Sequence, residues 1–146
     1  MRTLTVFAPS RKTVVLELGS MAKPMEGMRT CIDELMTHWG IDVARYSART
    51  ADALPKGYPG RWIVPSDYPR EMANRGYQGM VHFRLMVGPD GKPASCHIQR
   101  STRPKEFEQA VCKALMRRAT FTPALDTAGQ PFTSFFQSSV LFQMAS

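Results

Sequence analysis

Two runs of alternating apolar and polar residues, joined by a short turn, constrain this chain more than any other feature. Apolar side chains recur at every second position of residues 81–87, and the same period returns in residues 94–99. Between them, Gly88-Pro89-Asp90-Gly91-Lys92 is typical of a tight turn. Because a period of two places alternate side chains on opposite faces of a strand, the pattern predicts an antiparallel hairpin. Its core-facing side chains are Val81, Phe83, Leu85 and Val87 on the first strand, and Ala94, Cys96 and Ile98 on the second.

Helical patterns flank the hairpin. Ser66 or Asp67 is suited to cap a helix that has Pro69 in its first turn and ends at Gly76. A second helix is predicted from Pro104 to Arg117-Arg118, with an apolar face made of Phe107, Ala110, Val111, Ala114 and Leu115. In a last strand, one face carries Phe132, Phe136, Val140, Phe142 and Met144, and the other carries Thr133, Gln137, Ser139 and Gln143. This order predicts an α+β fold in which a small sheet has helices packed on one face.

The first forty residues predict a separate extension. Residues 3–7 and 13–18 are short β-type runs on either side of residues 8–12, which indicates a hairpin. A Met-rich amphipathic helix follows from Met21 to Trp39 and stops at Gly40. Its apolar stripe is interpreted as the buried face of a helix, and the alternative is a groove that re-packs around partners.

Residues 41–65 are rich in proline and glycine and have little periodicity, so we expect a linker there. The expected organisation is therefore an extension over 1–40, a linker over 41–65 and a domain over 66–146.

Charge and hydropathy limit the possible partners. The net charge of +7, from 19 Lys and Arg against 12 Asp and Glu, favours acidic partners without choosing among them. The basic residues are scattered, and their densest groups are Arg100/Arg103/Lys105 and Arg117/Arg118. No run approaches the roughly 20 apolar residues that a bilayer requires, and the first nine residues are too short an apolar run for a signal peptide.

A series of short motifs resembles the TonB C-terminal domain family over roughly residues 66–144. In order, the motifs are Tyr68-Pro69, Gly76-x-x-Gly79-x-Val81, Val87-x-x-Asp90-Gly91-Lys92, Ile98-x-x-Ser101, Phe107-x-x-Ala110 and Phe121-x-Pro123-Ala124. Each motif is weak alone, but their order and spacing are fairly specific. The cysteine pair and the Arg-Arg-Ala before Phe121 look like a variant found among TonB-like proteins of Gram-negative bacteria.

The resemblance implies a periplasmic module made of a three-stranded antiparallel sheet with two helices. In such a module the edge of the last strand pairs with a short extended segment of an outer-membrane TonB-dependent transporter. Carried onto this chain, the docking edge is the backbone of about Thr133 to Leu141, with Thr133, Phe135, Gln137, Ser139 and Leu141 as partner-binding residues. A complete transducer of this family couples to inner-membrane motor proteins through a membrane helix and a Pro-rich spacer. This sequence has neither, so we expect a piece of a longer, tethered precursor or a relative that binds without transducing.

Residue chemistry makes such an edge plausible and leaves rivals. Residues 132–144 are free of proline, and strand addition is a recognised way to bind extended peptides. One alternative is that the N-terminal hairpin covers the edge. Another is that a second copy of the chain covers it, which would make the protein a self-associating structural domain. A nucleic-acid binder using the positive charge is a third possibility, but no basic stripe with stacking rings supports it, so we expect no nucleic-acid partner.

Cys96 points inward and Cys112 lies beside the buried stripe of the second helix. The two can form a disulfide or remain buried thiols, and the compartment implied by the resemblance favours the disulfide. Cys31 is expected to be an unpaired core thiol. Cys31 and His38 share a helix face, but nothing has zinc-site spacing, so we expect no metal and no cofactor. No nucleophile elbow, P-loop or paired carboxylates occur, residues 126–129 are interpreted as a turn, and we expect no enzyme.

Overall fold

The computed structural model describes residues 3–7, 13–102 and 104–144. By its contacts the chain divides into two compact units, Met1–Gly40 and Ile41–Ser146. The division falls at the end of the predicted N-terminal extension. The two units are described separately below.

The first unit contains a hairpin and a helix, as the sequence predicted. Strands β1 (Thr3–Phe7) and β2 (Thr13–Glu17) pair antiparallel in a sheet of their own. The turn predicted over residues 8–12 lies outside the described residues. Helix α1 (Ala22–His38) follows, and the chain leaves it at Gly40 with a φ of 78°, a backbone conformation that favours glycine.

The apolar stripe of α1 differs from its predicted role. Met25, Met28, Ile32 and Leu35 are between 42% and 56% exposed, although Met36 is buried. The interpretation of this stripe as a buried helix face is therefore wrong for its four central residues. Cys31 is also exposed, so it is a free thiol as predicted but does not lie in a core.

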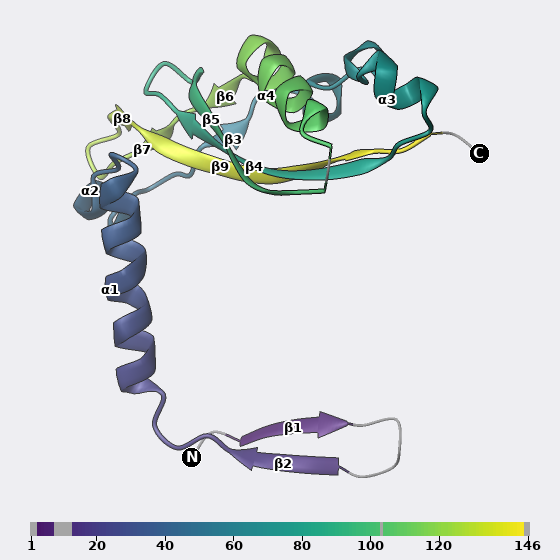
Figure 1. Cartoon of the computed structure of the whole chain (residues 1–146). Helices are drawn as coiled ribbons and strands as arrows, with labels where there is room; N and C mark the ends of the chain where they lie inside the picture. The colour runs from purple at the N-terminus through teal and green to yellow at the C-terminus, as the bar shows by residue number, and fades with distance from the viewer. Residues whose placement is uncertain (1–2, 8–12, 103, 145–146) are drawn as a thin grey trace. The chain divides into compact units, whose positions relative to one another are not determined.

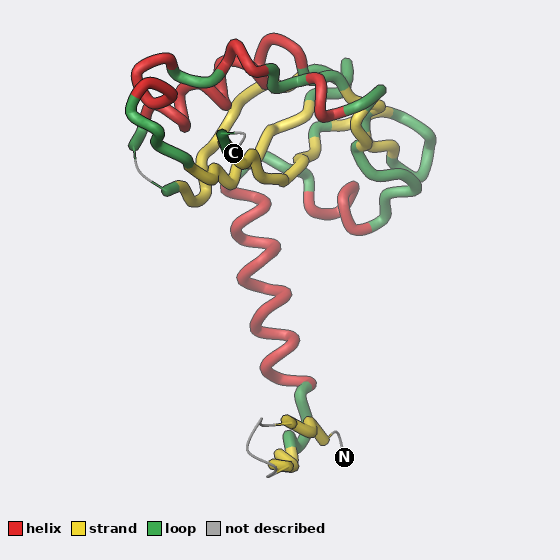
Figure 2. The backbone as a smooth tube through the Cα atoms, turned by 90° about the vertical axis from the view of Figure 1, so that its right-hand side faces the viewer, coloured by secondary structure: helices red, strands yellow, loops and turns green. Residues whose placement is uncertain are grey.

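The second unit is built on a three-stranded antiparallel sheet in the order β5-β4-β9 (Figure 1). Its strands are β4 (Gly79–Val87), β5 (Pro93–Ser101) and β9 (Ser134–Phe142). Helices α3 (Arg70–Asn74) and α4 (Glu106–Arg118) lie on one face of the sheet, and Figure 2 shows the same layering from the side. This is the α+β fold that the residue pattern predicted.

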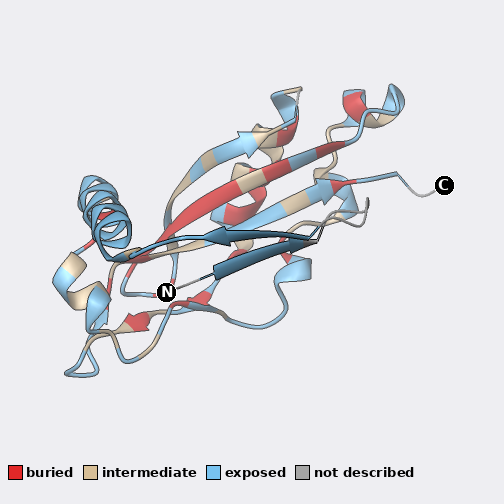
Figure 3. Cartoon of the chain, turned by 90° about the horizontal axis from the view of Figure 1, so that it is seen from below, coloured by how far each residue is buried: buried red, intermediate tan, exposed pale blue. Residues whose placement is uncertain are grey.

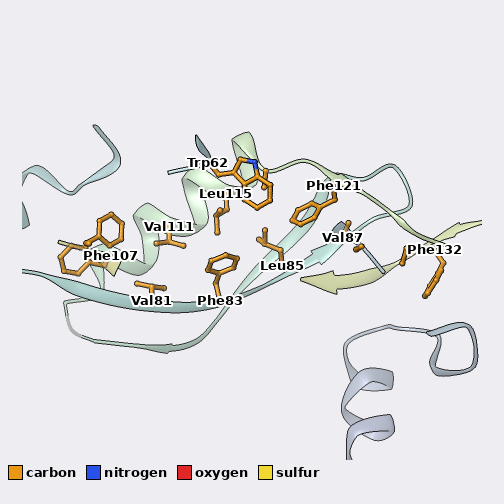
Figure 4. Packing of buried hydrophobic residues seen from close by; sticks show 14 of the residues in the cluster. Trp62, Val81, Phe83, Leu85, Val87, Phe107, Val111, Leu115, Phe121 and Phe132 are labelled. Carbon is orange, nitrogen blue, oxygen red and sulfur yellow. The ribbon is translucent and has the colours of Figure 1, made fainter. Parts of the chain in front are cut away.

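The core lies between this sheet and α4. Val81, Phe83, Leu85 and Val87 are all buried, as the period of two predicted, and they pack against Phe107, Val111 and Leu115 of α4 (Figure 4). Burying a large apolar side chain stabilises a fold by roughly 1.5–3 kcal/mol, so this cluster is the main source of stability.

The turn between β4 and β5 requires glycine at one position. Gly91 has a φ of 74°, and a Cβ there would lie 2.2 Å from the carbonyl oxygen of Phe121. The amide of Phe121 donates in turn to the carbonyl oxygen of Gly91 at 2.8 Å. This close approach ties the predicted turn to the chain that leaves α4.

The segment predicted as a linker is folded into the second unit. It contains α2 (Val43–Ser47), β3 (Leu54–Pro55) and the 3-10 turn η1 (Pro59–Arg61). Strand β3 pairs with β6 (Phe121–Thr122), and Trp62 is buried in the core with its ring centroid 5.1 Å from that of Phe121. The structure thus corrects the expectation of a linker over 41–65, because its apolar residues reach partners distant in the sequence.

Two further predictions are corrected at element boundaries. Pro69, and neither Ser66 nor Asp67, occupies the N-cap of α3, while the Asp67 carboxylate accepts from the Val64 amide at the 3-10 turn η2 (Pro65–Asp67). The last strand is interrupted: Phe132 belongs to β8 (Pro131–Phe132), which pairs with β7 (Ala124–Leu125), and β9 starts at Ser134. Met144 follows β9 and is 42% exposed.

Candidate functional site

The outer edge of β9 is the candidate binding site. In the described part of the chain β9 is hydrogen-bonded to β4 alone, and no described strand pairs with its other side. In an antiparallel sheet, neighbouring residues direct their N–H and C=O groups to opposite sides, so about half of those of β9 point away from β4. Such an edge can accept a further strand.

The N-terminal hairpin is one of the covers expected for this edge. Strands β1 and β2 pair with each other in a separate sheet. Pairing of β1 or β2 with β9 stays a prediction.

Aromatic contacts anchor β9 on its helix side. The ring of Phe142 stacks on that of Phe107 with centroids 4.8 Å apart, and the ring of Phe136 lies 5.2 Å from that of Phe121. Val140 is also partly buried against the core. These contacts hold the strand backbone in place, and all three residues belong to the predicted apolar face of the last strand.

The predicted partner-binding residues separate into two groups. Four of them lie on the face of β9 opposite the helices, since each pairs with a β4 residue of that face; they are Phe135, Gln137, Ser139 and Leu141. Thr133 precedes the strand and is half-buried between β8 and β9. Viewed from below, β4 forms a buried band between outer strands that are mostly half-buried or exposed (Figure 3). The role of all five residues in binding stays a prediction.

One of the predicted partner-binding residues, Phe135, is in contact with a neighbouring helix. The ring of Tyr46, on α2, stacks on that of Phe135 with centroids 5.5 Å apart. The guanidinium of Arg49 lies 4.0 Å above the Tyr46 ring, and that of Arg45 binds the Asp126 carboxylate at 2.7 Å. Helix α2 thus covers the Phe135 end of the strand, while Gln137, Ser139 and Leu141 are exposed.

Two arginines and two histidines lie on the face of the sheet opposite the helices. In the cross-strand register His82 lies opposite Arg100, and Arg84 lies opposite His97. Strands β4, β5 and β9 contain no Asp or Glu. Burial lowers the pKa of Arg84, but a guanidinium remains protonated at neutral pH. This face therefore carries two guanidiniums, of which that of Arg84 is buried and that of Arg100 is exposed.

Sequence reasoning missed Tyr46 and the grouping of these four side chains for different reasons. Tyr46 lies in the segment interpreted as a linker, and no local pattern signals its contact with Phe135. His82, Arg84, His97 and Arg100 are visible in the sequence, but the register that joins them is a property of the folded sheet.

The predicted disulfide is present. Cys96 on β5 and Cys112 on α4 are bonded, with their Cα atoms 5.6 Å apart. Among the described residues, no three His, Cys, Asp or Glu side chains are arranged to hold a metal ion. No helix in the described ranges has both the length and the apolar character needed to cross a bilayer.

Comparisons with known proteins agree with this geometry. Residues 64–144 match the family described as the Gram-negative bacterial TonB protein C-terminal. The solution NMR structure of the Pseudomonas aeruginosa TonB C-terminal domain is similar in fold, with a TM-score of 0.51 and 21% identity, over 66% of this chain and 90% of that one. No curated protein sequence matches the chain.

The family match spans more than half of the chain and the whole of the β5-β4-β9 sheet with α3 and α4. The structural similarity covers the same mixed fold. Sequence and structure therefore agree that this chain belongs to the family of Gram-negative bacterial TonB protein C-terminal domains.

Proposed function

We propose that this chain is a periplasmic protein-binding module that docks an extended segment of an outer-membrane transporter by adding it as a strand to the outer edge of β9. The proposal gives the chain a part in transport and no catalytic step, which is in keeping with a transport-associated, non-enzymatic family.

The open edge of β9 is the observation that carries the proposal. The strand is nine residues long, contains no proline, and has a second strand on one side only among the described residues. Each main-chain hydrogen bond contributes only about 0.5–1.5 kcal/mol net, so docking needs several bonds in a row. A strand of this length can offer about four or five outward residues.

Hydrogen exchange and amide shifts test the proposal directly. Periplasmic segments of transporters, as synthetic peptides, are titrated into ¹⁵N-labelled protein. In the free protein, alternate amides of β9 should exchange quickly because they do not bond to β4. With peptide bound, those same amides should shift and become protected. A peptide that binds while the β9 amides keep their shifts and exchange rates would contradict docking at this edge.

Proline substitutions add a test of the edge itself. Gln137 and Ser138 direct their N–H groups to opposite sides of β9. Of Gln137→Pro and Ser138→Pro, the variant that loses an outward N–H should abolish docking and keep its thermal unfolding midpoint. The variant that loses a bond to β4 should unfold at lower temperature. Thr127→Pro is the control. The amide of Gly129 donates to the carbonyl oxygen of Asp126 and closes a turn in which Thr127 is the exposed second residue, a position that accepts proline.

A further inference from the structure

We propose that the sheet accepts an added strand at β9 alone, because β5, its other outer strand, has a shape that disfavours strand addition. This inference rests on the proposed function and adds its direction and its stoichiometry. One chain binds one extended segment, and copies of the chain do not join head to tail by pairing β5 of one copy with β9 of the next.

The two outer strands differ in how regularly they pair with β4. Among the described residues, each of them is hydrogen-bonded to β4 alone. All nine residues of β9 pair with β4 without a shift in register. Pairing of β5 with the same strand shifts twice, so that Ala94 and Gln99 have no opposite residue on β4. The longest regular run of β5 is therefore residues 95–98, which form four consecutive pairs.

An extra residue on one strand of an antiparallel pair is a β-bulge, which bends the strand and increases its local twist. Ala94 shows the effect, since the period of two in the sequence placed it in the core but it is exposed in the structure. Regular outward N–H and C=O groups are limited to residues 95–98, which offer about two outward residues against about four or five on β9. A straight segment cannot follow β5 across either bulge.

Two side chains add to the protection of β5. Pro93 begins the strand and has no N–H to donate, and Arg100 places an exposed charge beside the second bulge. Bulges, proline and charged side chains are the means by which natural edge strands avoid pairing with other chains. Strand β9 contains no proline and no charged residue.

Fixed points before, between and after the bulges keep them in place. Before the first bulge, the amide of Gly88 donates to the carbonyl oxygen of Lys92 at 2.9 Å. Between the two, the disulfide ties Cys96 to α4. After the second, the amide of Thr102 donates to the carbonyl oxygen of Met80 at 2.9 Å. Because it is held at all three points, β5 cannot slide along β4 and straighten.

Two equally open edges would let copies of this chain polymerise. An interface between different surfaces of identical copies generates open filaments when its rotation does not close a ring. The bulges of β5 prevent this growth and leave β9 available for a partner.

A generic strand-forming peptide tests the inference in the unaltered chain. The probe is a synthetic peptide of alternating valine and threonine with a lysine at each end, added to ¹⁵N-labelled protein. Hydrogen exchange should slow at the outward amides of β9 and stay unchanged at residues 95–98. Titration calorimetry should give one peptide per chain. Equal protection of both edges, or two peptides per chain, would overturn the inference.

Removing the extra residues should create a second docking edge. Deleting both Ala94 and Gln99 leaves every other pair between β4 and β5 in its present register, because neither residue has an opposite on β4. The deletion variant should bind two peptides per chain, or gain mass with concentration by head-to-tail pairing. Gln99→Ala is the control, since it shortens the side chain and keeps the bulge, and it should bind one peptide. Circular dichroism checks the fold of both variants, and the wild-type measurement stands without them.

The outcomes separate this inference from the function on which it rests. A folded deletion variant that keeps the mass of one chain and binds one peptide, at β9, would overturn the role of the bulges and leave docking at β9 intact. Protection of both edges in the wild type would leave strand docking intact and overturn its confinement to β9. If the peptide protects neither edge, strand docking and its direction both fail.

Discussion

At the scale of single residues, Asp67 shows how one side chain can join distant segments. Its carboxylate accepts hydrogen bonds from both terminal nitrogens of Arg118, at 2.6 and 3.0 Å, and from the amide of Val64 at 2.8 Å. Arg118 also donates to the carbonyl oxygen of Trp62 at 2.8 Å. The pair therefore connects the end of α4 to the segment before α3.

This environment makes the stability of the fold depend on pH. The hydrogen bond from Arg118 is the largest influence on the pKa of Asp67, and together with the amide of Val64 it lowers that pKa below its usual value of 3.8. A carboxyl group whose pKa is lower in the folded state contributes stability above its unfolded pKa. That contribution is lost as the pH falls through the folded value.

We therefore expect Asp67→Asn to lower the free energy of unfolding at pH 7 by roughly 1–2 kcal/mol. The difference from wild type should shrink as the pH is lowered from about 4 toward 2. Urea unfolding at several pH values measures both. Asp52→Asn is the control, because the side chain of Asp52 is 60% exposed in its pair with Arg49. A difference that does not change with pH would contradict the account.

At the scale of elements, the disulfide joins β5 to α4 across a core that both elements help to bury. The Ser101 hydroxyl at the end of β5 also donates to the carboxylate of Glu108 on α4. Edge strand β5 is thus held from its helix side as well as by β4.

Replacing Cys96 by Ala should lower the thermal unfolding midpoint under oxidising conditions. Cross-linking residues 16 apart in sequence stabilises by roughly 3 kcal/mol, because it limits the unfolded chain. Under reducing conditions the wild type loses the same cross-link, so the variant and the wild type should unfold at similar temperatures. Cys31→Ala removes an exposed free thiol and should change neither midpoint. Equal midpoints of Cys96→Ala and oxidised wild type would show that the cross-link contributes no stability.

At the scale of the whole molecule, the same open edge could bind a second copy of this chain. That is the structural-domain alternative, and it competes with peptide docking for one row of main-chain groups. The exposed stripe of α1, made of Met25, Met28, Ile32 and Leu35, adds apolar surface that could also associate.

Light scattering distinguishes peptide docking from self-association. If the edge of β9 serves a peptide, the mass should stay that of one chain across the concentrations at which peptides bind. Self-association through β9 predicts a mass that rises with protein concentration. Added peptide, or the proline substitution that abolishes docking, should then restore the mass of a single chain.

Local sequence patterns were sufficient to predict the individual strands, helices and turns of the sheet domain. The period of two in residues 81–87, the apolar face of α4 and the turn at Gly91 all appear in the structure because side-chain spacing and backbone freedom are properties of a few neighbouring residues. The order of these elements was enough to predict the sheet and its helix-covered face.

Non-local contacts escaped the same reasoning. Residues 41–65 have no regular period because Tyr46 and Trp62 each meet partners more than fifty residues away, Phe135 and Phe121. Residues that each make a single long-range contact produce no periodic pattern of apolar side chains in the sequence.

The sequence by itself determined the elements, their order and which face of β4 enters the core, since apolar periodicity decides these within one segment. Only the tertiary structure decided that β9 lies at an edge, that α2 covers Phe135, and that two arginines and two histidines share the face opposite the helices. Strand order and register depend on the packing of the whole domain, because the sequence of one strand does not specify which other strands pair with it.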